Sequence, residues 1–447
     1  MVPEGRGDRR IVVLDDDPTG TQTVHDVWVV TRWTEAALRF GLKDEAGLFY
    51  VLTNSRSLSE EAALELNREI AANLSEAAAA LGHEFDVVSR SDSTLRGHFP
   101  AEVDALRSEL QMRHSWRYDG TIICPFFPEG GRFTVGDVHY VADGKQLVPA
   151  AETEYAQDSD FGYTKSNLRE WVAEKTSGRI GAEEVVSVDL HTIRREGPLG
   201  VRRVLGTMTG GRVAVVNALT YEDLFVFVAG LRAAQEEGQR FLFRTAASFV
   251  KAYGGIRDRG LLSREEMVTS PAGRGLVVVG SHVAKTTRQL HEALALESVR
   301  PVELRVRRVL ASSDRDQEIE RVAGRANETL TSGQVAMVYT SRELVTDLPG
   351  VDTLEIGQRV SSALVDVVRN IRVRPDFVIA KGGITSSDVA TEGLAVERAR
   401  VLGQILPGVP VWRIGPESTF PGIPYVVFPG NVGSTRDLGR AIGILQG

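Results

Sequence analysis

The chain has 447 residues, 42% of them hydrophobic and 25% charged, which is the composition of a globular protein rather than of a disordered chain, a collagen or a small disulfide scaffold. Its 52 basic and 60 acidic residues give a formal net charge of −8, which argues against a general nucleic-acid-binding protein but not against a small anionic substrate. No apolar run is long enough to span a membrane and MVPEGRGDRR has no signal-peptide core, so we expect a cytoplasmic protein.

In the first half of the chain, short apolar runs rich in β-branched residues alternate with helical patterns. Most of these runs are apolar on both faces, which is typical of strands buried between helices in a parallel sheet. A long helix is predicted over Ser59–Leu81, and the Asp143-Gly144 pair within Val138–Val148 predicts a hairpin. The expected strands are Ile11–Leu14, Val27–Val30, Leu48–Leu52, Phe85–Ser89, Thr121–Cys124, Val185–Leu190 and Val213–Asn217.

From Tyr253 to Gly275 the sequence turns polar and glycine-rich, which predicts a junction between domains. The sequence therefore predicts two α/β domains, each with a mostly parallel sheet flanked by helices, over residues 1–255 and 273–447 with a linker at 256–272. Beyond the junction we expect strands at Leu276–Val279, Gln334–Tyr339, Phe377–Ala380, Val409–Ile414 and Tyr425–Phe428, and helices at Lys285–Leu296, Asp316–Leu330, Ile356–Ile371 and Asp388–Ile405.

Three consecutive carboxylates, Asp15, Asp16 and Asp17, follow the first predicted strand. Ligands of open α/β sheets bind beyond the carboxyl ends of the strands, so these positions are the first candidates for a site. Three packed carboxylates are electrostatically unfavourable unless cations or hydrogen-bond donors lie nearby. One interpretation is an Asp-rich turn with a helix cap, which needs only one Asp. The other is a general base, a ligand of metal-bound water or a group that binds hydroxyls.

Two further polar segments follow predicted strands at the same edge. Arg56, in TNSRSL, is either a surface charge or an anion clamp, because its planar fork matches a carboxylate. The segment SRSDSTLRG offers cations for a carboxylate and hydrogen-bonding groups for hydroxyls, although a capped turn before a helix at Pro100–Leu110 is the alternative. Its candidate residues are Arg90, Ser91, Asp92, Ser93, Thr94 and Arg96.

In the second half, small residues follow three strands, in GLVVVGSHVAKTT, FVIAKGGITSSDVA and YVVFPGNVGSTRDL. Glycines at the heads of helices let main-chain N–H groups approach phosphates, and three such turns in one domain favour a nucleotide site. Neither a Walker A motif nor a strand-linked G-x-G-x-x-G is found. The candidate nucleotide ligands are Ser281, Lys381, Gly382, Gly383, Thr385, Gly430, Asn431 and Gly433, of which Lys381 has the equal alternative of a surface lysine.

Two other functions fit part of these observations. IVVLDDDPTGT matches the hhhhDxDxT signature of haloacid-dehalogenase-like phosphatases, with Asp15 as nucleophile and Asp17 as acid/base. That function leaves the glycine turns without a role, and no convincing later lysine and paired-acid motif is found. A sensor that binds a sugar acid and a nucleotide without turnover is the third alternative, but no segment resembles an output domain.

Several ordered segments make the chain similar to the four-carbon acid sugar kinase family over nearly its whole length: DDDPTG, TNSR, SRSDSTLRG, CPFFPEGGR, VVGS, KGGITSSD and FPGNVG. The resemblance implies an N-terminal domain that binds the acid sugar, a C-terminal domain that binds the nucleotide, and ATP-dependent phosphorylation of the terminal hydroxyl of threonate, erythronate or a 3-oxo-tetronate. It implies acceptor-site roles for Asp16, Asp17, Arg56, Arg96 and the loop Ser91–Thr94, and contacts to ATP from Ser281, Gly383 and Gly430. Many members read ADDLTGA where this chain reads DDDPTGTQTV.

The mechanism expected from these assignments is in-line phosphoryl transfer. Arg56, with Arg90 or Arg96, pairs with the acceptor's carboxylate, Asp17, Asp92 and Ser93 bind its hydroxyls, and Asp16 orients or deprotonates the terminal hydroxyl. Mg²⁺ is expected to bridge the phosphates, held mostly by water, with its protein ligands unknown. The expected partners are a small anionic sugar acid and ATP, with no nucleic acid and no membrane. The identity of the acid and the formation of a homo-oligomer are left open.

Overall fold

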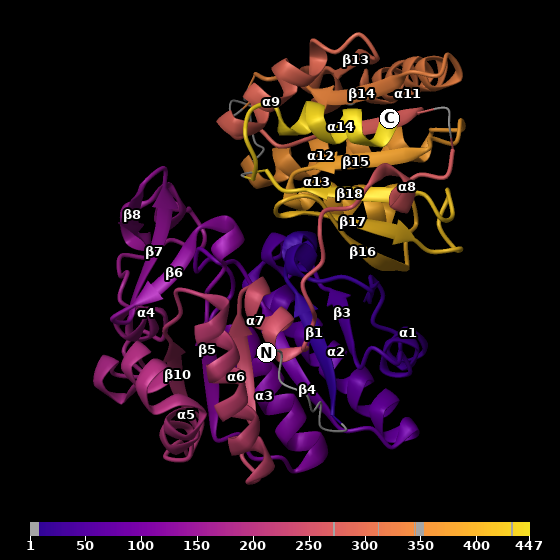
Figure 1. Ribbon diagram of the computed structural model, residues 1–447. Coiled ribbons are helices and arrows are strands. Elements are labelled where there is room, and N and C mark those ends of the chain that lie inside the picture. Colours follow the sequence, from indigo (N-terminus) through magenta and orange to yellow (C-terminus); the bar gives the residue numbers. More distant parts are fainter. Residues whose placement is uncertain (1–8, 271–272, 312, 344, 346–352, 431) are drawn as a thin grey trace. The chain divides into compact units, whose positions relative to one another are not determined.

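A computed structural model describes residues 9–270, 273–311, 313–343, 345, 353–430 and 432–447 (Figure 1). The chain divides into two compact units, residues 1–258 and 259–447. A separate hydrophobic core lies within each unit. Among the helices of the described ranges, none is both long and apolar enough to cross a membrane.

The first unit is built on a sheet whose strand pairs are all parallel. The strands are β1 (Arg10–Asp15), β2 (Val27–Val30), β3 (Leu48–Leu52), β4 (Phe85–Arg90), β5 (Gly120–Cys124), β9 (Val186–Val188), β10 (Arg212–Val216) and β11 (Phe241–Thr245). They lie in the order β2-β3-β1-β4-β11-β5-β10-β9. Every residue of β3, β4, β5 and β11 is buried, as expected of strands covered on both faces.

Helices and a small second sheet complete this unit. Helix α2 begins at a Ser59 cap, whose hydroxyl accepts from the Ala62 N–H, and ends at Gly82 with a φ of 65°. The hairpin predicted at Asp143-Gly144 joins two strands of an antiparallel sheet, which comprises β6 (Arg132–Val135), β7 (Val138–Asp143) and β8 (Gln146–Pro149). The helices are α1 (Glu35–Leu42), α2 (Glu60–Leu81), α3 (Ala101–His114), α4 (Leu168–Lys175), α5 (Gly197–Leu205), α6 (Tyr221–Glu236) and α7 (Ala247–Tyr253).

The second unit has a mixed sheet of its own. Its strands are β12 (Gly275–Val279), β13 (Val299–Leu304), β14 (Val335–Thr340), β15 (Phe377–Lys381), β16 (Arg398–Leu406), β17 (Val409–Ile414) and β18 (Pro424–Phe428). The strands lie in the order β13-β14-β12-β15-β18-β17-β16. Neighbouring strands from β13 through β18 pair in parallel, whereas β17 pairs antiparallel with both β18 and β16. The helices are α8 (Arg264–Met267), α9 (Ala284–Leu294), α10 (Val306–Leu310), α11 (Arg315–Thr331), α12 (Thr353–Arg369), α13 (Gly383–Asp388) and α14 (Asp437–Gln446).

The predicted helix over Asp388–Ile405 is wrong. A π-helical turn, η8 (Val389–Gly393), follows α13, and the chain then enters strand β16. The side chains of Arg398–Leu406 alternate between partly and fully buried positions, which is the period of a strand. The helix-forming residues of the preceding segment concealed this alternation. Strand β11 was missed altogether, although it lies in the middle of the first sheet between β4 and β5.

Candidate active site

The three consecutive carboxylates lie where three neighbouring strands end. Because β1 pairs in parallel with both β3 and β4, the carboxyl ends of all three meet at one edge, and Asp15 lies opposite Arg90. Asp15 and Asp16 are only 1% and 3% exposed. Asp17 caps the short 3-10 helix η1 (Pro18–Thr23), because its carboxylate accepts from the Thr19 N–H at 2.7 Å.

Two arginines from the neighbouring strand ends hold these carboxylates. Arg56 donates to Asp16 at 3.0 Å and lies 3.2 Å from Asp17. Arg90 donates to Asp15 at 2.9 Å and lies 3.5 Å from Asp16. The two positive charges offset the electrostatic repulsion among three adjacent carboxylates. The predicted clamp residue Arg56 is therefore already engaged by acids of the chain itself.

The acids of this cluster differ in their protonation. Burial raises the pKa of Asp15 to about 8, the neighbouring charges of Asp16 and Asp17 add to the shift, and Arg90 opposes it. Burial also acts to raise the pKa of Asp17, but Arg56, Arg90 and the Thr19 N–H outweigh it and hold that pKa below its usual value. One carboxyl of the cluster thus tends to be neutral near pH 7 while another is firmly ionised.

The loop after β4 carries the rest of the predicted acceptor site. The Ser91 hydroxyl donates to Asp16 at 2.9 Å, which brings this loop against the acid cluster. Asp92 accepts from Arg96 at 2.7 Å and from the Thr94 hydroxyl. Burial would raise the pKa of Asp92, but the charges of Arg96 and Arg56 hold it well below its usual range. Asp92 is therefore an ionised hydrogen-bond acceptor beside Arg56, whose guanidinium lies 3.9 Å away.

Main-chain groups of this loop are held by the side chains of His139 and Tyr163. From the sequence, His139 in GDVHYVADG could lie near the site or could simply follow the strand register, and Tyr163 was missed. The His139 ring, fully buried, bonds the Ser93 carbonyl at 2.8 Å, and the Tyr163 hydroxyl donates to the Thr94 carbonyl at 2.8 Å. Burial lowers the pKa of His139 to about 4, so the ring is neutral at physiological pH. Gly97 has a φ of +117°, and a Cβ there would lie 2.5 Å from the Arg244 guanidinium.

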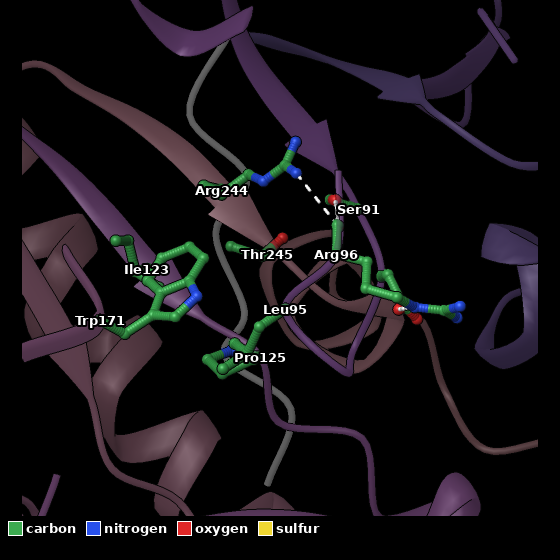
Figure 2. A pocket seen from close by; sticks show the side chains of 9 residues that line it. Ser91, Leu95, Arg96, Ile123, Pro125, Trp171, Arg244 and Thr245 are labelled. Atoms are coloured by element: carbon green, nitrogen blue, oxygen red, sulfur yellow. Dashed lines mark hydrogen bonds and ion pairs between the residues drawn. The ribbon is translucent and has the colours of Figure 1, made fainter. Parts of the chain in front are cut away.

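A small pocket opens beside this loop (Figure 2). Thr245 and Trp171 each present a buried polar atom, Oγ1 and Nε1, that has no hydrogen-bond partner in the described part of the chain. Arg244 is paired with Glu102 at 2.8 Å and donates to the Arg96 carbonyl at 3.4 Å. Sequence reasoning missed Arg244 and Thr245 because they end the missed strand β11. The lining residues are Ser91, Asp92, Leu95, Arg96, Ile123, Pro125, Trp171, Arg244 and Thr245.

In the second unit, the three glycine-bearing turns converge around Ser281. They follow β12, β15 and β18, which are neighbours in the sheet. Gly382 has a φ of +116°, and a Cβ there would lie 3.0 Å from the Ser281 Cβ, while a Cβ at Gly430 would lie 3.2 Å from the Ser281 hydroxyl. The Thr286 hydroxyl donates to the Gly430 carbonyl at 3.1 Å. The turns thus present closely packed main chain, as a phosphate site requires.

The other predicted nucleotide ligands have different positions. A Cβ at Gly280 would overlap the Thr385 hydroxyl, so these two turns touch. Gly383 begins α13, and Gly433, with a φ of +84°, lies beside Asp437. Asn431 lies outside the described residues. Sequence reasoning missed Arg342, which follows β14 and donates to the Ser281 carbonyl at 2.8 Å.

Lys381 is fully buried, so the surface alternative for this residue is wrong. Its ammonium group donates to the Pro429 carbonyl at 2.9 Å and lies 4.1 Å from the centre of the Phe428 ring. Burial, with the charge of Lys285, lowers its pKa to about 7. Lys381 therefore ties the turn after β18 to the end of β15 and titrates near physiological pH.

The described residues do not form a cage for Mg²⁺. Within them, no three His, Cys, Asp or Glu side chains lie close enough together to hold a metal ion. Asp16 and Asp15 are engaged by Arg56 and Arg90 instead. An ion held mainly by phosphate oxygens and water needs no such cage, and Mg²⁺ favours that type of site.

Two family models match the chain: a sugar-binding N-terminal domain over residues 11–253 and a nucleotide-binding C-terminal domain over residues 276–438. A D-erythronate kinase of Heliobacterium modesticaldum is 27% identical over 382 residues, covering 81% of this chain and 79% of the relative. A 3-oxo-tetronate kinase of Pseudomonas savastanoi pv. phaseolicola is 27% identical over 344 residues, covering 73% and 71%. A D-threonate kinase of Bordetella bronchiseptica is 32% identical over 168 residues, covering 35% and 38%.

Solved structures share the fold. A protein from Salmonella typhimurium LT2 superposes with a TM-score of 0.71 at 20% identity, over 98% of both chains. A Haemophilus influenzae protein gives a TM-score of 0.64 at 18% identity, over 97% of this chain and 100% of that one.

Proposed function

The chain belongs to the four-carbon acid sugar kinase family, and we propose on that premise that it transfers the γ-phosphoryl group of ATP to the terminal hydroxyl of a four-carbon sugar acid. Threonate, erythronate and 3-oxo-tetronate are the candidate acceptors, since the named relatives act on these acids. The observation that carries the proposal is the presence, in one chain, of a buried acid and arginine cluster in the first unit and three converging glycine turns in the second.

Asp16 is the proposed base of the acceptor site. Its two carboxylate oxygens are held by Arg56 and Ser91, at 3.0 and 2.9 Å, so the group is fixed in orientation. The acceptor oxygen attacks the γ-phosphorus, the bond to the β-phosphate oxygen breaks, ADP leaves, and the hydroxyl proton passes to Asp16. Phosphoryl transfer has a loose transition state, so positioning of the hydroxyl contributes more than removal of its proton.

The other polar groups of the first unit bind the substrate's hydroxyls in this proposal. Asp17 and Asp92 are ionised acceptors, and Ser93 lies in the same loop. The unpartnered Thr245 and Trp171 atoms of the pocket offer further hydrogen bonds. The predicted pairing of the substrate's carboxylate with Arg56, Arg90 or Arg96 stays a prediction. Each of these guanidiniums already pairs with acids of the chain.

The second unit supplies the nucleotide site in this proposal. Main-chain N–H groups near Ser281, Gly383 and Gly430 bind the phosphates, and Arg342 is a cation beside the same turns. Mg²⁺, when bound, neutralises charge on the phosphates. This role needs no side-chain cage from the described residues.

The phosphatase alternative finds no support at its nucleophile. Asp15 is 1% exposed and paired with Arg90, and burial raises its pKa to about 8. A carboxyl group that stays protonated at pH 7 is a poor nucleophile. In the same cluster, the Asp16 carboxylate accepts hydrogen bonds from Ser91 and Arg56.

The test is an assay of ADP release with ATP, Mg²⁺ and each of the three acids. We expect ADP release that depends on at least one acid, and no release of inorganic phosphate from the phosphorylated acid, which a phosphatase would hydrolyse. Binding of an acid and ATP without ADP release would indicate a sensor. Either hydrolysis of the phosphorylated acid or a lack of acid-dependent ADP release contradicts the proposed function.

A further inference from the structure

We propose that Arg132 binds the carboxylate of the substrate and thereby selects an acid over an uncharged polyol. This inference rests on the proposed function. It gives a role to the last residue of the segment CPFFPEGGR, to which the resemblance assigns none.

The arginines at the acid cluster are already neutralised. Arg56 faces Asp16, Asp17 and Asp92, Arg90 faces Asp15 and Asp16, and Arg96 faces Asp92 and Asp158. Five carboxyl groups thus surround three guanidiniums. Even with Asp15 protonated, the cluster carries excess negative charge, which repels a substrate carboxylate but suits hydroxyl groups.

Arg244, which lines the pocket, is also paired with an acid of the chain. Arg244 is 5% exposed and donates to the Glu102 carboxylate at 2.8 Å, while Ser55 donates to the other oxygen of that carboxylate. A buried carboxylate of the chain neutralises the field of a guanidinium that it pairs with, so this guanidinium attracts an anionic ligand only weakly.

Arg132 differs from these four arginines. It forms no ion pair with an acidic side chain of the described residues. Its buried Nε has no hydrogen-bond partner there, as is also true of the Nε of Arg56 and of Arg90. The residue is held by its main chain instead, because its N–H and carbonyl both bond Phe127, at 2.9 and 3.0 Å, and it begins strand β6. A half-buried cation on a fixed strand, without a counter-charge, is suited to bind an anion.

Arg132 lies beside the loop that carries the predicted acceptor residues. Its guanidinium carbon is 5.5 Å from the centre of the Tyr155 ring, and that of Arg96 is 5.3 Å from the same centre. Burial dominates the low pKa of His139, and the charge of Arg132 lowers it further. Since His139 bonds the Ser93 carbonyl, the field of Arg132 reaches this loop.

The contacts then lead away from Arg132 to the reactive end of the site. Arg96 shares Tyr155 with Arg132 and binds Asp92, and Asp92 lies beside Arg56, which binds Asp16. The proposal requires that a sugar acid with its carboxylate on Arg132 extends its hydroxyls along the aspartates and its terminal hydroxyl toward Asp16. The guanidinium lies over the Tyr155 ring, 5.5 Å from its centre, and its planar fork can make a two-point contact that lysine does not make.

The test compares the acid with its own amide, which keeps every hydroxyl but carries no charge. The wild-type chain is expected to prefer the acid in kcat/KM, and Arg132→Gln to reduce that preference by about 30- to 100-fold, as loss of a partly desolvated charge pair does. The kcat/KM for the amide and the KM for ATP should change less than threefold. Arg132→Lys should keep part of the preference.

Arg117→Gln is the matched control. Arg117 is exposed and precedes the N-terminal end of β5, whereas the pocket lies at the carboxyl end of that strand. This substitution should leave the preference unchanged. Thermal unfolding checks that each variant is folded, and Arg132→Lys carries the comparison if Arg132→Gln does not fold. An unchanged preference in the folded Arg132 variants, or its loss in Arg56→Gln but not in them, overturns the inference. If the wild-type chain phosphorylates none of the acids, the proposed function fails first and this inference falls with it.

Discussion

The Arg56 guanidinium donates to the Asp16 carboxylate at 3.0 Å across 40 positions of sequence. The two residues follow β3 and β1, which are parallel neighbours, so the sheet itself brings them together. The second oxygen of Asp16 accepts from Ser91, which follows β4 on the other side of β1. Three strand ends therefore fix one carboxylate, and Asp16 is the centre of the proposed acceptor site.

Replacement of Asp16 by Asn should reduce kcat by about 100-fold or more, because Asn retains the shape of the side chain but accepts no proton. Nucleotide affinity should stay within threefold of wild type. The matched variant is Asp15→Asn, which mimics a carboxyl that burial already tends to keep neutral, and it should retain most of the activity. Steady-state kinetics and nucleotide titration measure both. Normal turnover in Asp16→Asn with loss of turnover in Asp15→Asn would reverse the assignment and favour the phosphatase.

The buried Asp15 should make the stability of the chain depend on pH. Its carboxyl has a pKa of 3.8 as a free group and about 8 in the folded chain. The contribution of this carboxyl to the free energy of unfolding is fully present below pH 3.8 and is lost as the pH rises through about 8. Melting temperatures at pH 5, 7 and 9 should therefore fall with pH more steeply for wild type than for Asp15→Asn. Parallel curves for the two proteins would show that Asp15 is not titrating in this window.

Gly382→Ala should weaken nucleotide binding by about tenfold or more. The residue has a φ of +116°, which L side chains rarely adopt, and its added Cβ would lie 3.0 Å from the Ser281 Cβ. The turns around Ser281 must then move apart. Calorimetric titration with ATP measures the loss, and binding of the sugar acid should not change. Gly443→Ala is the control, since a Cβ there meets no atom within 4 Å; equal losses in both variants would contradict a specific effect at the turns.

Lys381 should take up a proton when the nucleotide binds. Burial lowers its pKa to about 7, so at pH 8 most molecules carry the neutral amine, and nearby phosphates should raise that pKa. Calorimetry at pH 8 in buffers of different ionisation enthalpy should give an uptake approaching one proton, which is lost in Lys381→Met. An uptake that persists in the variant would assign the proton to another group.

The sequence predicted the parallel strands of both sheets well because most of them are continuous apolar runs, such as Leu48–Leu52 and Phe377–Lys381. It failed where local composition opposed tertiary context. Arg398–Leu406 follows a segment rich in helix-forming residues, and it is a strand because it pairs with β17.

The candidate site was predictable by residue type but not by pairing. Strand ends identify Asp16, Arg56 and the loop after β4 as neighbours, because parallel strands bring their carboxyl ends to one edge. Sequence spacing does not reveal that Arg56 is shared among three aspartates while Arg132 pairs with none of the described ones. These pairings depend on side-chain geometry, and because of them we propose that Arg132, and not Arg56, binds the substrate's carboxylate.

The identity of the product shows whether the terminal hydroxyl receives the phosphoryl group. The acid that supports ADP release is prepared with ¹³C at its terminal carbon, incubated with ATP and Mg²⁺, and examined by ¹³C and ³¹P nuclear magnetic resonance. We expect one ADP for each phosphate ester formed, with coupling between phosphorus and the labelled carbon. Release of inorganic phosphate without an ester, or a phosphate on any other carbon, would contradict the proposed function.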